Sequence, residues 1–265
     1  MEPWKIALIG ALGAGMIGYG VYANKTPTGD LQPPAPGGTP KPIKYVGTTL
    51  PAWPTITQWM NTPAPVSLGA LKGKTVLFEV FRTECSHCQA AAPFLVKLHG
   101  RYAPRGVVFV GVESPIKSTQ PGWPESDWTK VQTWVKGKGY TWPVGFDENS
   151  RWFQGKFGNG VYYPSLFLIP PNGVVSYFQS GHDSEKTLSL ATELEKAAPG
   201  QGDLPARAQD LTRFLAEDLG VQKDKDAQQS LEADIERRLK QTTAASPSTP
   251  PKSAALPSAP SPQLR

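Results

Sequence analysis

The sequence predicts an α/β domain in which a mixed β-sheet carries helices on both faces. Three features predict this class: continuous apolar runs typical of buried strands, amphipathic helices between them, and two further strands joined by an Asn-Gly turn. The elements follow the order strand, helix, strand, helix, strand, strand, helix, which is typical of helices packed on both faces of a mixed sheet. We expect this domain to occupy residues 45–198 of the 265-residue chain.

The first half of the domain is expected to contain two strands and two helices in alternation. Thr75–Phe81 is a run of β-forming residues and 107–112 is a second continuous apolar run, so both are expected to be buried strands. Residues 86–99 place alanine, leucine and phenylalanine on one side, which predicts an amphipathic helix between the strands. Ser126 is expected to cap a further helix that continues to about Lys138.

The second half is expected to contain a short helix, a β-hairpin and a final helix. The hairpin is predicted by the dipeptide Asn172-Gly173, because both residue types accept the positive φ angles of a tight turn. The expected bounds are 149 or 150 to about 157 for the short helix, 165–169 and 174–178 for the two strands, and 184–197 for the final helix.

Two more helices are predicted beyond the domain, in a helical extension over residues 199–241. Leucines share one face of 204–219 and aliphatic residues share one face of 227–240, and Gly220 separates the two segments. Two interpretations remain open: the helices pack on the domain, or they form an arm that binds a partner or drives oligomerisation. Residues 242–265 are rich in proline, serine and alanine and are expected to form a disordered tail.

The N-terminal residues 1–24 are expected to be a signal-anchor or a cleavable signal peptide. Residues 6–23 carry no charge, and as a helix they would be about 27 Å long, close to the thickness of the bilayer core. Little chain precedes this segment, so we expect a single-pass protein of the cell membrane with its domain on the extracytoplasmic, periplasmic side. Cleavage would instead give a secreted or periplasmic protein. Residues 25–44 are expected to be a proline-rich linker.

Composition excludes several functional classes. The net charge of +5 is scattered along the chain and forms no basic stripe, so no nucleic-acid partner is expected. The chain has two cysteines, Cys85 and Cys88, which excludes a disulfide-dense scaffold and a four-cysteine zinc module. No cofactor is predicted.

The cysteine pair is the feature that carries chemistry. Cys85-Ser-His-Cys88 follows a predicted strand directly and opens a predicted helix. The free N–H groups and positive dipole end of a helix N-terminus stabilise a thiolate at Cys85, and Cys88 lies one turn further along, close enough to attack a mixed disulfide there. His87, when protonated, would favour the same thiolate. An inert disulfide or half of a metal site are the structural alternatives.

Residues 76–95 resemble the active-site segment of thioredoxin-like proteins, and most of all the TlpA/ResA-like, membrane-anchored thiol-disulfide oxidoreductases. The stretch 66–74, and Phe157-Gly158 followed by 163–169, are similar to further motifs of that branch. The resemblance covers about residues 49–197. It implies a thioredoxin-like three-layer α/β/α fold and an enzyme that exchanges disulfides with cysteine-containing exported proteins.

The resemblance also implies roles for individual residues. Cys85 would be the attacking thiolate and Cys88 the resolving thiol. Glu79 would be a buried acid that takes the proton of the inner cysteine, and burial in an apolar strand would raise its pKa, which suits proton transfer. Pro93 matches a helix-kinking proline, and Pro164 matches a cis-proline that faces the cysteines.

Three positions depart from the family pattern: Glu84 replaces a tryptophan, Ser86 replaces a proline, and Tyr163 replaces a smaller residue. The charge of Glu84 opposes a thiolate at Cys85. The redox direction is therefore left open. A reductase would keep exported cysteines reduced, for example in cytochrome c biogenesis, and would need a membrane protein as electron donor; oxidative folding uses the same site in reverse.

The sequence leaves alternatives to this function. The first alternative is a copper-binding chaperone on a thioredoxin-like fold, because two cysteines and a histidine suit Cu(I). A peroxiredoxin is disfavoured because Arg82 stands where its threonine is required, and a non-catalytic scaffold would use the C-terminal helices. His99 and His182 are not expected to be catalytic.

Overall fold

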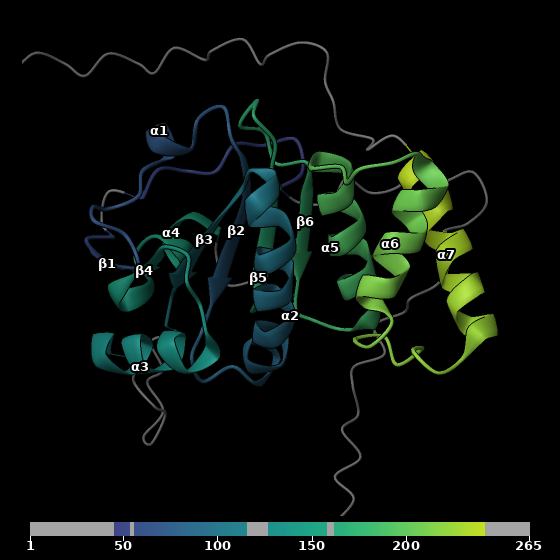
Figure 1. Cartoon of the computed structure of the whole chain (residues 1–265). Helices are drawn as coiled ribbons and strands as arrows, with labels where there is room; N and C mark the ends of the chain where they lie inside the picture. The colour runs from purple at the N-terminus through teal and green to yellow at the C-terminus, as the bar shows by residue number, and fades with distance from the viewer. Residues whose placement is uncertain (1–44, 54–55, 116–126, 158–161, 242–265) are drawn as a thin grey trace, which may run out of the picture. The chain divides into compact units, whose positions relative to one another are not determined.

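The computed structural model describes residues 45–53, 56–115, 127–157 and 162–241. These residues form one mixed sheet of six strands in the order β1-β4-β3-β2-β5-β6 (Figure 1). β2 pairs in parallel with β3 and β3 with β4, whereas the pairs β1–β4, β2–β5 and β5–β6 are antiparallel. The strands are β1 (Gln58–Met60), β2 (Thr75–Phe81), β3 (Val107–Glu113), β4 (Val144–Phe146), β5 (Ser165–Ile169) and β6 (Tyr177–Ser180).

The helices pack on both faces of this sheet. Phe81 of β2 stacks on Trp134 of α3 at 4.9 Å, while on the opposite face Phe167 of β5, the register partner of Phe78, contacts Phe157 of α4 at 5.6 Å. α2 and α5 contact each other and lie in front of the sheet in Figure 1. The helices are α1 (Leu68–Leu71), α2 (Ser86–Tyr102), α3 (Trp128–Lys138), α4 (Phe153–Phe157), α5 (Ser184–Ala197), α6 (Leu204–Leu215) and α7 (Lys225–Lys240), with 3₁₀ turns at Ala103–Arg105 and Glu148–Ser150.

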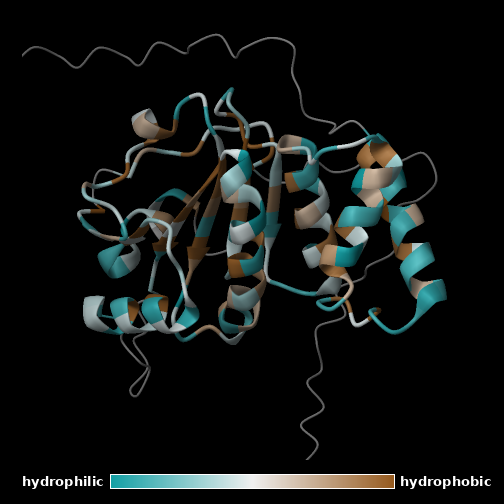
Figure 2. Cartoon of the chain, in the orientation of Figure 1, coloured by the Kyte–Doolittle hydropathy of each residue, from teal (hydrophilic) through white to brown (hydrophobic). Residues whose placement is uncertain are grey.

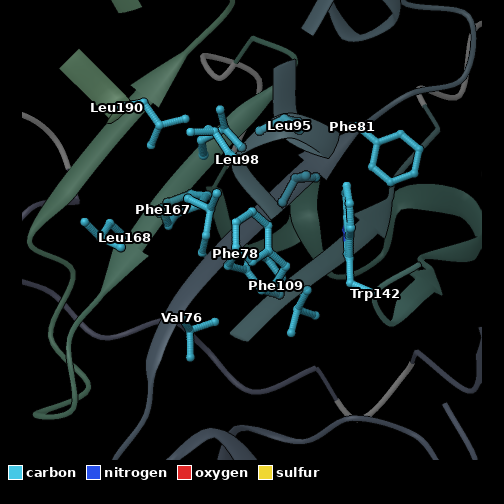
Figure 3. Close-up of a cluster of buried hydrophobic side chains, with 14 of the residues drawn as sticks. Val76, Phe78, Phe81, Leu95, Leu98, Phe109, Trp142, Phe167, Leu168 and Leu190 are labelled. Carbon is cyan, nitrogen blue, oxygen red and sulfur yellow. The ribbon is translucent and has the colours of Figure 1, made fainter. Parts of the chain in front are cut away.

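The core lies between the central strands and the helices that cover them. β2 is buried along almost its whole length, with β3 on one side and β5 on the other, and Figure 2 shows the central strands as the most hydrophobic elements. Figure 3 shows buried side chains of this core, which come from β2, β3, β5, the segment before β4, α2 and α5 and lie on both faces of the sheet. The labelled residues are Val76, Phe78, Phe81, Leu95, Leu98, Phe109, Trp142, Phe167, Leu168 and Leu190.

Aspartates start four of the helices. In each, the carboxylate accepts a hydrogen bond from a backbone N–H in the first turn, which satisfies a donor that has no partner within the helix. The capping residues are Asp127 for α3, Asp183 for α5, Asp203 for α6 and Asp224 for α7. The cap predicted at Ser126 lies outside the described residues, and Asp127 holds the capping position.

The hairpin prediction was correct for β5 but wrong for the start of β6. The turn forms at Pro170-Pro-Asn-Gly173, yet β6 begins at Tyr177 and not at residue 174. Val175 pairs with a distant segment instead: its N–H donates to Thr48 O at 2.8 Å, and its carbonyl accepts from Gly47 N at 2.9 Å. A long-range backbone pairing therefore takes the place of the predicted hairpin pairing.

The cap predicted for the short helix was also wrong. Asn149 and Ser150 both have positive φ angles, 62° and 53°, and stand in the turn before the helix. Asp147 does the capping, because its two carboxylate oxygens accept the N–H groups of Trp152 and Phe153 at 3.0 and 2.9 Å. α4 consequently starts at Phe153, later than predicted.

The C-terminal helices pack on the domain, in agreement with the first interpretation of the extension. α6 and α7 contact each other and both contact α5 (Figure 1). Leu211, Leu215 and Ile235 are fully buried in this packing. Lys97 of α2 adds ion pairs at 2.9 and 3.1 Å with two acids that follow α6.

A buried carboxylate ties these helices together. Glu195 of α5 has no exposed surface, and groups from α2, from the turn after α2 and from α6 donate hydrogen bonds to it. The charged and polar donors compensate the cost of burying the carboxylate. They are Tyr102 Oη (3.1 Å), Arg105 Nη2 (2.9 Å), Arg101 Nη2 (3.5 Å), Arg207 Nε (3.3 Å) and the backbone N–H of Gly200 (2.6 Å).

Within the described residues, none of the helices combines the length and the apolar character that a membrane crossing requires. The predicted anchor at 6–23, the linker at 25–44 and the tail at 242–265 lie outside those residues. The mixed sheet with a helix-opening cysteine pair after β2 confirms the thioredoxin-like α/β fold.

The Glu195 cluster predicts a large effect on stability. We expect Glu195→Ala to lower the free energy of unfolding by about 3–5 kcal/mol, because it leaves the arginines of the cluster without their buried partner. Glu236→Ala is the control: it removes an exposed ion pair with Lys240 and should cost no more than about 1 kcal/mol. Urea unfolding followed by tryptophan fluorescence measures both, and equal losses in the two variants would contradict the assignment.

Candidate active site

Cys85 occupies the capping position at the start of α2. β2 ends at Phe81, and a turn follows in which the N–H of Cys85 donates to Arg82 O at 3.3 Å. The Sγ atom of Cys85 accepts a hydrogen bond from the backbone N–H of Cys88 at 3.4 Å, as a capping side chain does. The turn after β2 therefore places the half-buried thiol of Cys85 next to the free backbone N–H groups at the start of α2.

This position lowers the pKa of Cys85 from 9.0 to about 6. The largest cause is the hydrogen bond from the Cys88 side chain, which stabilises the thiolate and lowers the pKa. Burial raises the pKa, and hydrogen bonds from the backbone N–H groups of Cys88 and His87 lower it further. The positive charge of His87 makes a smaller contribution. Because the pKa of Cys85 lies below neutral pH, the charge of Glu84 does not prevent a thiolate there.

Cys88 is the opposite of Cys85 in exposure and charge. It is fully buried on the inner side of α2, and burial, followed by its hydrogen bond with Cys85, raises the pKa of its thiol above the ordinary value. Both cysteines are free, so the structure represents the dithiol form. Cys85 is thus favoured as a thiolate, and Cys88 is kept protonated.

Glu79 lies beneath this pair, on the face of β2 that α2 covers. Its side chain is buried, and burial raises its pKa from 4.5 to about 8, although a hydrogen bond from Tyr140 lowers it somewhat. The charge of Glu79 in turn acts on Cys88 and raises the pKa of that thiol. Glu79 is neither on an edge strand nor directed to solvent, since β2 has neighbours on both sides and the side chain is 3% exposed.

The Tyr163–Pro164 peptide bond is cis, as the sequence predicted. The loop that carries it faces the nucleophile: the Cys85 thiol donates to the carbonyl oxygen of Tyr163 at 3.7 Å. The guanidinium of the buried Arg82 lies 5.7 Å from the centre of the Tyr163 ring, a cation–π contact. Residues immediately before Pro164 thus form one wall of the site.

The three histidines do not form a metal-binding cluster with the cysteines in the described structure. His87 is exposed on the first turn of α2. His99 packs against Phe109 and Trp142, and His182 against Phe94. In the described part of the chain, no three His, Cys, Asp or Glu side chains are placed so that they could hold a metal ion together.

Two features of the site were not predicted from the sequence. A pocket of about 440 Å³ is lined by Thr83 and Glu84, which directly precede Cys85 in the chain, and by residues of α3 that include Trp134. Tyr140 is the second feature, because its hydroxyl donates to Glu79 Oε1 at 3.2 Å. The partners are 61 residues apart, so no local sequence pattern could have joined them.

The site predicts how the reactivity of Cys85 depends on pH. We expect the rate of alkylation of the reduced chain by iodoacetamide to rise with pH around a midpoint of about 6, where the thiolate forms. Cys88→Ala removes the largest stabilising hydrogen bond and should move the midpoint upward. His87→Gln removes only the smaller charge effect and should move it less. A larger shift for His87→Gln than for Cys88→Ala would contradict this ordering.

The chain is similar in sequence to several known proteins. The family model described as Redoxin matches residues 46–194, more than half of the chain. Protein DipZ of Mycobacterium bovis is 30% identical over 159 residues, which cover 57% of this chain and 21% of that protein. The thiol-disulfide oxidoreductase ResA of Bacillus anthracis is 28% identical over 110 residues, covering 42% of this chain and 57% of ResA. The chain thus spans less than two thirds of these relatives.

Solved structures are also similar to the chain. A thiol-disulfide isomerase from Corynebacterium glutamicum matches with a TM-score of 0.46 and 22% identity over 58% of this chain and 98% of that one. A thiol:disulfide interchange protein of the thioredoxin family from Chlorobium tepidum matches with a TM-score of 0.44 and 27% identity over 58% and 97%. On the extent of the family match, the chain belongs to the Redoxin family.

Proposed function

We propose that this protein is a thiol-disulfide oxidoreductase that exchanges disulfides with cysteine-containing protein substrates. The observation that carries the proposal is the contrast between Cys85, a half-buried helix cap whose pKa is about 6, and Cys88, a buried thiol whose pKa is raised. Exchange needs a thiolate that attacks from the surface and a second thiol that waits until the mixed disulfide has formed. The name of the relative ResA supports the same activity.

In the reducing direction the reaction has two steps. The Cys85 thiolate attacks one sulfur of a substrate disulfide, so that a mixed disulfide forms and the other substrate sulfur leaves as a thiolate. Cys88 then gives its proton to Glu79 and attacks Cys85 Sγ. The second substrate sulfur leaves as a thiolate, and the products are a reduced substrate and a Cys85–Cys88 disulfide.

Glu79 suits either direction of this reaction because its pKa is near 8. Above that pH the carboxylate accepts the proton of Cys88. Below it the carboxylic acid donates a proton to the Cys88 thiolate that leaves when a substrate thiolate opens the disulfide. A carboxyl with an ordinary pKa would be fully ionised at neutral pH and would serve only as the acceptor.

The proposed location is the extracytoplasmic, periplasmic face of the cell membrane, with the N-terminal segment as a single-pass anchor. The uncharged stretch 6–23 supports this location. The proposed role is reductive: the protein would keep exported cysteines reduced, as in cytochrome c biogenesis, and a membrane protein would return electrons to the Cys85–Cys88 disulfide. If residues 6–23 are cleaved as a signal, the product would be secreted or periplasmic.

The reduction potential tests the reductive role. Thioredoxin, with a cysteine pKa near 7, has a potential of about −270 mV, and DsbA, with a pKa near 3.5, has about −120 mV. A pKa of about 6 for Cys85 supports a potential nearer to that of thioredoxin. We expect equilibration of the full chain with dithiothreitol or glutathione buffers to give a value closer to −270 mV.

A potential near −120 mV would overturn the reductive role and indicate an oxidant or isomerase. Failure to form an exchange-competent disulfide would overturn the oxidoreductase proposal itself. Stoichiometric Cu(I) binding at neutral pH, lost on mutation of either cysteine, would then favour the copper-binding chaperone.

Trapping of the mixed disulfide tests the substrate class. In cells that express the full chain, Cys88→Ser removes the resolving thiol, so we expect it to accumulate covalent adducts with exported, cysteine-containing proteins. Cys85→Ser is the matched control and should form none, because it lacks the nucleophile. Adducts that contain only cytoplasmic proteins would contradict the proposed location and substrates.

A further inference from the structure

Glu79 has one hydrogen-bond donor in the described structure, and that donor is Tyr140. The tyrosine lies in the segment between α3 and β4, where its ring packs against Trp142 at a centroid distance of 4.0 Å and against Trp134 at 5.2 Å. Both Glu79 and Tyr140 are 3% exposed. The hydroxyl reaches Glu79 Oε1 at 3.2 Å, and Glu79 Oε2 has no hydrogen-bond partner. One carboxyl oxygen is therefore fixed and the other is available.

None of the neighbouring groups named below can replace Tyr140 as a hydrogen-bond donor to Glu79. The register partners of Glu79 in the sheet are Gly111 of β3, which has no side chain, and Leu166 of β5, whose side chain is apolar. From α2, the titratable group that acts on it is Cys88. Glu113 is the next acid on the same face, two residues beyond Gly111 along β3, and brings no positive charge or donor N–H to Glu79.

We propose that Tyr140 is a positioning residue for proton transfer between Cys88 and Glu79: its hydroxyl holds Oε1, so that Oε2 is the oxygen that accepts the Cys88 proton. The inference rests on the proposed function, because it assigns a residue to the same exchange reaction. The bonds that change are those of the resolving step, in which Cys88 attacks Cys85 Sγ. The Cys88 proton moves to Oε2, the Cys85–Cys88 bond forms, and the bond from Cys85 to the substrate sulfur breaks.

Tyr140 acts as a fixed donor and does not itself relay the proton. Burial raises the pKa of Tyr140 well above its ordinary value, so the hydroxyl keeps its proton over the working pH range. A hydrogen bond to a carboxylate favours the charged form. Tyr140 consequently limits how far burial raises the pKa of Glu79, and its loss should make the carboxylate harder to form.

A second buried Tyr–Glu pair in the same protein provides a matched comparison. Tyr102 Oη donates to Glu195 Oε2 at 3.1 Å, nearly the distance found for Tyr140 and Glu79. Glu195 also receives hydrogen bonds from arginines and a backbone N–H, and it lies at the far end of α2 from the cysteines. Removing the Tyr102 hydroxyl thus makes a similar change in a buried pair without touching the proton acceptor of Cys88.

The reaction of the reduced full chain with an aromatic disulfide, 5,5′-dithiobis(2-nitrobenzoate), separates the two steps. Attack by Cys85 releases the first thionitrobenzoate, and attack by Cys88 on the mixed disulfide releases the second. Stopped-flow absorbance records both phases between pH 5 and 10. The first phase reports the nucleophile, and the second reports proton transfer from Cys88.

We expect the second phase of the parent chain to accelerate with pH around a midpoint of about 8. Tyr140→Phe should move that midpoint upward by about one unit and slow the second phase about tenfold at pH 7, with the first phase unchanged. Glu79→Gln should remove this ionisation from the second phase. Tyr102→Phe should leave both phases as in the parent.

The first phase tests the proposed exchange activity, and the pH dependence of the second phase tests the role of Tyr140. A normal first phase in Tyr140→Phe shows that the site is folded. If the midpoint of its second phase then equals that of the parent, the positioning role of Tyr140 is overturned while exchange activity stands. If the parent chain lacks the first phase, the oxidoreductase proposal itself is overturned.

Discussion

The site depends on one constraint, which is that the carboxyl of Glu79 and the thiol of Cys88 are both removed from water beneath α2. Burial disfavours the charged form of an acid, so it raises the pKa of both groups. Cys85 differs because it caps the helix, where the Cys88 thiol and backbone N–H groups stabilise its thiolate. The two cysteines of one motif thus differ in charge at neutral pH, and in the proposed exchange reaction this difference separates the nucleophile from the resolving thiol.

α2 is held at both ends, and this explains why the C-terminal helices are part of the same architecture. Its first turn meets the loop before β5 through Cys85 and Tyr163. Its last turn carries Arg101 and Tyr102, which bind the buried Glu195 of α5 together with a residue of α6. α2 is therefore anchored to the loop before β5 at its first turn and to α5 and α6 at its last turn.

Local sequence patterns predicted the elements that are long or well capped, and they failed where distant contacts decide. β2, β5 and α5 have the predicted bounds, because a continuous apolar run or an amphipathic stretch defines each one. β1 and β4 were not predicted, because each has only three residues and such a short strand shows no periodicity. Val175 was predicted in the hairpin, but its backbone pairs with residues 47 and 48 instead. At the site, motif spacing predicted the cysteines, but the partner of Glu79 comes from a separate crossover and had no signal in the sequence.

The titration of the Glu79 carboxyl tests the central claim most directly. It can be followed in the reduced full chain by ¹³C NMR of labelled glutamate carboxyl carbons, with the resonance assigned by its absence in Glu79→Gln. We expect a midpoint of about 8, set by burial and moderated by one hydrogen bond. A midpoint near 4.5, the value of an ordinary glutamate, would show that the carboxyl is hydrated and would contradict its role as a buried proton acceptor for Cys88.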